Sequence, residues 1–110
     1  MMENTTDLRP KIITLCGSTK FKKQFEEVME KLTLDGCIVL TVGFFEQSDN
    51  IEITEEQIKL FEKLHYHKID MSDGIYVVNA NGYIGESTKK EIQYALQKGK
   101  EVNYFYEKLL

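Results

Sequence analysis

The hydrophobic positions along this chain follow two alternating patterns. Four short runs are almost continuously apolar and rich in β-branched residues, as strands covered on both faces usually are. These predicted strands are residues 11–16, 37–42, 74–78 and 101–105. Between the strands, apolar residues recur every three or four positions, which predicts amphipathic helices. The predicted helices are residues 18–34, 54–72 and 87–98.

The regular alternation of strands and helices predicts an α/β fold. Each strand is joined to the next by one helix, and right-handed crossovers of this kind give a parallel sheet with helices on both faces. We therefore expect a flavodoxin-like or Rossmann-like three-layer sandwich with a sheet of four, or at most five, parallel strands in the order 2-1-3-4. Residues 1–10 are expected to form a flexible tail, and residues 11–110 a single domain.

Two loops that follow predicted strands carry glycine and hydroxyl residues immediately before a helix. The free N–H groups of a helix N-terminus can bind an anion. Ligands of such sheets bind at the carboxyl ends of the strands, where the strand order reverses, so both loops should face one crevice. We expect them to bind a phosphate group. The expected phosphate-binding residues are Gly17, Ser18, Thr19, Lys20, Gly85, Ser87 and Thr88.

Lysine residues crowd the start of the first and last predicted helices, where the helix dipole disfavours cations. Lys22 and Lys23 belong to the first helix, and Lys89 and Lys90 to the last. A bound phosphate would make these charges favourable. The alternative is that they are solvated lysines on a helix face.

Glu91 follows the second loop and has two interpretations. Thr88 and Glu91 match the capping box S/T-x-x-E, in which the glutamate only stabilises the helix start. However, Glu91 also lies four residues before Ala95, at the border of the inward face, where its carboxylate would face the crevice. In the first turn of a helix, the dipole would keep this carboxylate ionised.

The residues described so far resemble the nucleoside 2-deoxyribosyltransferase-like proteins, which include the deoxyribonucleoside 5′-monophosphate N-glycosidases. The resemblance covers residues 11–105 and rests on Cys16, Gly17 and Ser18, on the strand at 73–78, and on residues 85–95. It implies a flavodoxin-like fold, and a homodimer or higher homo-oligomer with shared sites.

The same resemblance implies roles for individual residues. Where the family has Glu-Leu-Gly-x-Ala, this chain has Glu-Ile-Gln-Tyr-Ala, which makes Glu91 the nucleophile that attacks the anomeric carbon. Gly17, Ser18 and the region of Ser87 would hold the 5′-phosphate. The chain departs from the family at Gln93, which replaces a glycine.

A second departure concerns the acid that protonates the leaving base. The family places an aspartate where this chain has His65. Histidine side chains titrate near neutrality, so His65 could serve as this acid, and Asp70 is a nearby alternative. The spacing of Phe61, His65 and Ile69 also fits a histidine at the edge of the core, so both interpretations stay open.

Three aromatic residues lie in loops at the predicted ligand end and could stack on a base. They are Phe44, Phe45 and Tyr83. Phe44 and Phe45 could equally pack beneath their loop or at a subunit interface.

Composition excludes several classes of function. A net charge of −4 argues against binding of nucleic-acid polymers, which requires a basic face. No apolar run approaches the length of a membrane span, and the first residues do not resemble a signal peptide. We therefore expect a cytoplasmic protein that binds no membrane.

No metal and no cofactor are expected. Cys16 and Cys37 belong to no CxxC motif and should lie too far apart for a disulfide, so they are interpreted as small apolar residues. His65 and His67, two positions apart on a helix, point to different faces, which does not favour a metal site.

These observations lead to one main hypothesis and two alternatives. The main one is an N-glycosidase that cleaves the glycosidic bond of a nucleoside or deoxynucleoside 5′-monophosphate. The alternatives are a non-catalytic nucleotide-binding or sensing protein and a nucleoside deoxyribosyltransferase. All three have a nucleotide or nucleoside as the partner.

Overall fold

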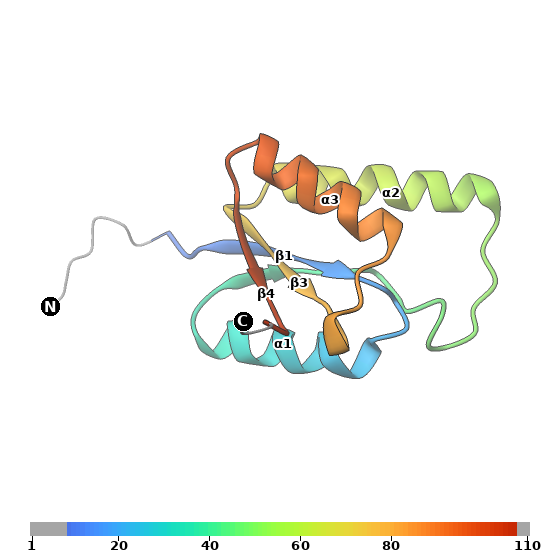
Figure 1. Ribbon diagram of the computed structural model, residues 1–110, viewed down its shortest axis with the longest axis horizontal. Helices are drawn as coiled ribbons and strands as arrows, with labels where there is room; N and C mark the ends of the chain where they lie inside the picture. Colours follow the sequence, from blue (N-terminus) through green and yellow to red (C-terminus); the bar gives the residue numbers. More distant parts are fainter. Residues whose placement is uncertain (1–8, 108–110) are drawn as a thin grey trace, which may run out of the picture.

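The structure, a computed structural model, describes residues 9–107 and confirms the α/β fold (Figure 1). Four strands form one all-parallel sheet in the predicted order β2-β1-β3-β4. The strands are β1 (Ile12–Gly17), β2 (Ile38–Leu40), β3 (Gly74–Val78) and β4 (Glu101–Tyr104). The helices are α1 (Lys22–Leu34), α2 (Glu55–Asp70) and α3 (Glu86–Gln97), with a 3-10 turn, η1, at Ala80–Gly82.

The helices lie on both faces of the sheet, as predicted. α1 covers one face, and α2 and α3 lie together over the other (Figure 1). Side chains alternate between the two faces of a strand, so neighbouring residues of β1 enter different cores. Leu15 packs with Phe25 and Val28 of α1. Cys16 packs on the other side, with Ile69 of α2 and Ala95 of α3.

Several element boundaries differ from those predicted. α1 begins at Lys22 rather than at residue 18, because the preceding residues form a turn in which the Phe21 N–H donates to the Ser18 carbonyl at 3.0 Å. β2 is limited to three residues because only Ile38–Leu40 pair with β1. β4 ends at Tyr104, one residue earlier than predicted.

A capping box begins α2. The Gln57 N–H donates to Thr54 Oγ1 at 3.1 Å, and the Thr54 N–H donates to Gln57 Oε1 at 2.9 Å. Glu55 and Glu56 follow in the first turn, where the helix dipole favours negative charge. This start signal is entirely local, which explains why the sequence predicts it.

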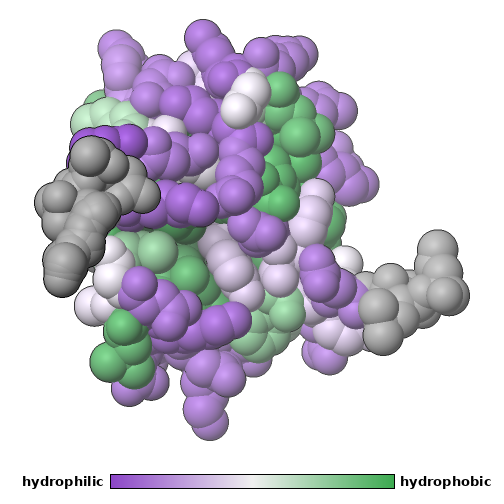
Figure 2. All heavy atoms as spheres, turned by 90° about the vertical axis from the view of Figure 1, so that its left-hand side faces the viewer, coloured by the Kyte–Doolittle hydropathy of each residue, from purple (hydrophilic) through white to green (hydrophobic). Residues whose placement is uncertain are grey.

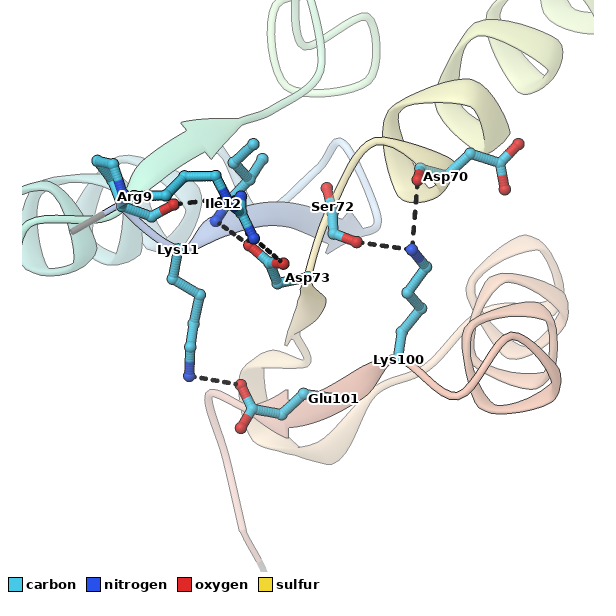
Figure 3. A network of polar contacts seen from close by, with 9 residues as sticks. Arg9, Lys11, Ile12, Asp70, Ser72, Asp73, Lys100 and Glu101 are labelled. Atoms are coloured by element: carbon cyan, nitrogen blue, oxygen red, sulfur yellow. Dashed lines mark hydrogen bonds and ion pairs between the residues drawn. The ribbon is translucent and has the colours of Figure 1, made fainter. Parts of the chain in front are cut away.

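Polar side chains hold the strands together at their amino ends (Figure 3). Arg9 Nη2 donates to Asp73 Oδ1 at 2.8 Å, and the Ile12 N–H donates to Asp73 Oδ2 at 2.8 Å. These two hydrogen bonds lower the pKa of Asp73 to about 2. Arg9 is therefore anchored to the domain rather than part of a free tail. The rest of the predicted tail, residues 1–8, lies outside the described residues.

The amino-terminal end of the sheet is mainly polar at its surface. Figure 2 shows this face with hydrophilic side chains over most of it and separate hydrophobic areas between them. Among the helices that the structure describes, none combines the length and the apolar character needed to cross a membrane.

Candidate functional site

A cavity of about 450 Å³ opens at the opposite end of the sheet, beyond the carboxyl ends of β1 and β3. Its walls come from the loop after β1, the loop after β2, one face of α2, and the segment from residue 83 to the second turn of α3. The two glycine loops therefore face one crevice, as the strand order predicts.

Most of the candidate residues from the sequence line this cavity. Those in its lining are Gly17, Ser18, Thr19, Phe44, His65, Tyr83, Gly85, Ser87, Thr88 and Glu91. Three candidates do not belong to the lining. Lys20 lies over the Tyr83 ring, with Nζ 3.7 Å from the ring centroid. Phe45 packs against Phe25 of the core, with ring centroids 5.3 Å apart. Asp70 accepts a hydrogen bond from the Tyr94 hydroxyl at 2.6 Å.

The N-terminus of α3 forms one wall of the cavity. Gly85 is the N-cap and provides no side chain to cap the helix. The Lys89 N–H is the first to bond back into the helix, donating to the Gly85 carbonyl at 3.0 Å. The N–H groups of the first turn therefore have no helical acceptor, and the residues that carry them line the cavity.

The first loop contains a buried, unpaired hydroxyl in a residue that lines the same cavity. Thr19 is only 9% exposed, and its Oγ1 has no hydrogen-bond partner in the described part of the chain. A buried hydroxyl without a partner costs free energy, which a ligand that accepts its hydrogen bond would recover.

Glu91 lies in the second turn of α3, with 12% of its side chain exposed. The helix begins at Glu86, so Thr88 lies inside the helix and not at its N-cap. The capping-box interpretation of Glu91 is therefore wrong, and so is its placement in the first turn. Instead, Glu91 Oε1 lies 3.6 Å from Nε2 of His65.

Burial sets the protonation of both groups. It raises the pKa of Glu91 to about 7, partly offset by a hydrogen bond from Cys16 and reinforced by the charge of Glu62. The expectation that the helix dipole keeps Glu91 ionised is thus wrong, because desolvation is the larger effect. Burial, with the charge of Lys68, lowers the pKa of His65 to about 4. His65 is then neutral at pH 7, so its contact with Glu91 is not an ion pair there.

The raised pKa predicts that Glu91→Gln changes the pH dependence of stability. The unfolded carboxyl ionises near its usual pKa of 4.5 and the folded one near 7, so the stability that Glu91 contributes to wild type is lost as the pH rises between these values. The lowered pKa of His65 acts in the opposite direction in both wild type and variant. The variant lacks the ionisable carboxyl group of Glu91. The free energy of unfolding of the variant minus that of wild type should therefore rise by up to about 3 kcal/mol as the pH increases through this range. Denaturant unfolding at several pH values, with a chelator present, measures the difference.

The matched control for this measurement is Glu86→Gln on the same helix, where the side chain is 85% exposed. Its stability should follow that of wild type across the same pH range. Parallel pH profiles for wild type and Glu91→Gln would contradict the raised pKa.

The sequence analysis missed several residues on α2 that line the cavity. Ile58, Phe61, Glu62 and Lys68 share one helix face with His65. Phe61, Glu62 and Lys68 lie three or four residues from His65, and Ile58 lies seven, and this helical spacing is a signal that could have identified them. The ring of Phe61 contacts that of Phe44 edge to face, with centroids 5.3 Å apart.

Two of the four lysines at the helix starts have carboxylate partners within the protein. Lys22 Nζ lies 3.1 Å from Asp49 Oδ1, and Lys89 Nζ lies 3.4 Å from Glu86 Oε2. These two contacts weaken the case that the lysines bind a phosphate, so the argument for an anion rests mainly on the helix N-terminus and the hydroxyl groups.

Comparison of the chain with protein-family models, with curated proteins and with solved structures finds no match. The fold and the geometry of the cavity are therefore the basis for assigning a function.

Proposed function

We propose that this protein is an N-glycosidase that releases the base from a nucleoside or deoxynucleoside 5′-monophosphate. The observation that carries the proposal is the position of Glu91, a buried carboxyl group in the same cavity as an uncapped helix N-terminus. The carboxyl group suits nucleophilic attack on a sugar carbon, and the helix N-terminus suits the binding of a phosphate group. The sequence resemblance of the two loops and of Glu91 supports the same assignment.

The cavity has the size and surface that such a substrate needs. About 450 Å³ lies within the range of small-molecule sites. The hydroxyl groups of Ser18, Thr19 and Ser87, with the first N–H groups of α3, would donate to phosphate oxygens. The edge-to-face pair of Phe44 and Phe61 offers an apolar wall to a flat base.

The reaction uses Glu91 in its ionised form. Its carboxylate attacks the anomeric carbon as the glycosidic C–N bond breaks, and the bonding electrons leave with the base. Water then hydrolyses the glycosyl ester and frees the carboxylate. The departing base needs a proton, which neutral His65 does not carry as an imidazolium. Glu62, a further carboxyl group in the cavity lining, acts on Glu91 as a negative charge and so carries no proton to donate, and Asp70 lies outside that lining; the departing base therefore takes its proton from solvent water.

The proposal is tested by incubating the chelator-treated protein with the common nucleosides and their 5′-monophosphates, and by detecting free base by chromatography. We expect release from at least one monophosphate, and slower release from the matching nucleoside. A second free base added to the same reaction would reveal transfer instead of hydrolysis. Absence of release from every compound would overturn the proposal.

The rate of base release should rise with pH through about 7, because only ionised Glu91 is a nucleophile and burial raises its pKa to that value. A series of initial rates at saturating and at low substrate, from well below to well above pH 7, measures this rise. A rate that falls across this range would contradict the assignment of Glu91 as the nucleophile.

A second candidate function is nucleotide binding without catalysis, favoured by the neutral His65 at the position expected for the acid. Thermal stabilisation by a monophosphate, with no release of base, would identify it.

The homo-oligomer and the cytoplasmic location stay predictions. The exposed Ile58, Leu60 and Leu64 on α2 offer a surface for a second copy.

A further inference from the structure

Three side chains that favour metal ions meet beside the cavity. Cys16 comes from β1, His65 from α2 and Glu91 from α3, and their potential ligand atoms all lie within 4.8 Å of one another. Cys16 Sγ is 3.3 Å from Nε2 of His65, which is 3.6 Å from Oε1 of Glu91. The proposed glycosidase chemistry uses only one of the three groups, Glu91, as a reactant.

We propose that Cys16, His65 and Glu91 form a binding site for a zinc ion. Tetrahedral zinc holds a cysteine sulfur at about 2.3 Å and a histidine nitrogen or carboxylate oxygen at about 2.0–2.2 Å, which places the ligand atoms about 3.3–3.6 Å apart. The separations of 3.3 and 3.6 Å in this protein match those of such a site. The third pair of ligand atoms, from Cys16 and Glu91, also lies within 4.8 Å.

The chemistry of the three ligands favours zinc over the hard cations. Thiolate and imidazole are ligands of zinc and related transition metals, whereas magnesium and calcium require oxygen ligands. A thiolate and a carboxylate together carry two negative charges, which a divalent cation neutralises in this buried setting. Binding releases the thiol proton of Cys16 to solvent.

The site would keep one open coordination position. Three protein ligands leave the fourth position of a tetrahedral ion to water or to another small ligand. His65 and Glu91 both line the cavity, so that position is reached from the cavity. This arrangement distinguishes the site from a closed structural zinc site with four protein ligands.

Zinc binding has a consequence that rests on the proposed function. A carboxylate oxygen that is bound to zinc cannot attack the anomeric carbon, so zinc and base release exclude each other. Zinc would therefore inhibit the glycosidase by occupying its nucleophile, and a chelator would restore the activity.

Cobalt(II) is the probe for the site, because it adopts the geometry of zinc and absorbs light. The full chain, freed of metal by chelation and kept reduced, is titrated with cobalt under anaerobic conditions. We expect a thiolate-to-cobalt charge-transfer band and the intense visible bands of tetrahedral cobalt, both of which zinc should abolish by displacement. A titration without these bands would overturn the proposal.

Matched variants assign the bands to this site. Cys16→Ser should lose the charge-transfer band and bind zinc at least about a hundredfold more weakly, since a direct ligand is lost. Cys37→Ser, the other free cysteine, and His67→Gln, an exposed histidine on α2, should behave as wild type. A band that survives Cys16→Ser and disappears in Cys37→Ser would refute the site. Should Cys16→Ser fail to fold, as judged by circular dichroism, His65→Gln gives the second test through weakened zinc binding.

The spectra and the activity separate the two proposals. Cobalt bands in a protein that releases no base would support the zinc site and overturn the proposed function. Base release that zinc does not inhibit, in a protein without cobalt bands, would support the glycosidase and overturn the zinc site.

Discussion

Replacing Glu91 with glutamine is expected to abolish base release, lowering kcat/KM by at least about a thousandfold. The amide has almost the same shape as the carboxyl group but cannot attack the anomeric carbon or stabilise positive charge on the sugar. Because Glu91 is mostly buried with a raised pKa, the change removes an ionisable group that the fold disfavours, and the variant should remain folded. Loss of activity would therefore reflect chemistry rather than unfolding.

The measurement compares initial rates of base release in chelator-containing buffer, together with monophosphate affinity by calorimetry. Affinity should stay within a few-fold of wild type, since the groups proposed to bind the phosphate do not include the Glu91 side chain. Glu26→Gln, on an exposed position of α1 outside the cavity lining, is the control and should retain its activity. Base release by Glu91→Gln at a rate close to wild type would remove Glu91 from the mechanism.

Replacing Gly17 with alanine should destabilise the fold by about 3 kcal/mol. Gly17 has φ +153°, a conformation that side-chain-bearing residues rarely adopt, and an added Cβ would lie 2.7 Å from the Val78 carbonyl oxygen. That oxygen belongs to the backbone of the neighbouring strand, so it cannot move aside as a side chain could. This close approach holds Gly17, where the first loop begins, against Val78 at the end of β3. The chain continues from Val78 toward the second loop.

Denaturant unfolding measures this effect, with Gly43→Ala as the matched control. Gly43 also lines the cavity, but an added Cβ would meet nothing within 4 Å, so its stability should change by less than about 1 kcal/mol. Equal stability of the two variants would show that the contact between Gly17 and Val78 relaxes at little cost.

Local signals determined the elements whose boundaries the sequence predicts correctly. β3 is a continuous apolar run and was predicted at residues 74–78, where the structure places it. The capping box of Thr54 and Gln57 depends on residues only three positions apart. The start of α1 was wrong because Ser18 to Phe21 form a separate turn, closed by a hydrogen bond from the Phe21 N–H to the Ser18 carbonyl, which the apolar periodicity does not reveal.

Single residues of the candidate site also fall into those that the sequence identified and those that only the packing reveals. The glycine loops and Glu91 were found because strand order alone brings the carboxyl ends of β1 and β3 together. Phe45 was assigned to the ligand end together with Phe44, but only packing decides that one ring faces the cavity and the other the core. Glu62 and Lys68 each lie three positions from His65, and only the packing of α2 shows that the face they share with it turns toward the loops.

The sequence by itself determined the α/β fold, the strand order and the two loops, because periodicity and crossover handedness depend on residues that are close along the chain. Only the tertiary structure decided the chemistry of the site. It placed Cys16 and His65, 49 positions apart, in contact, and put Glu91 beside them. It also buried Glu91 deeply enough for desolvation to outweigh the helix dipole, and burial depends on what every other element places around a residue.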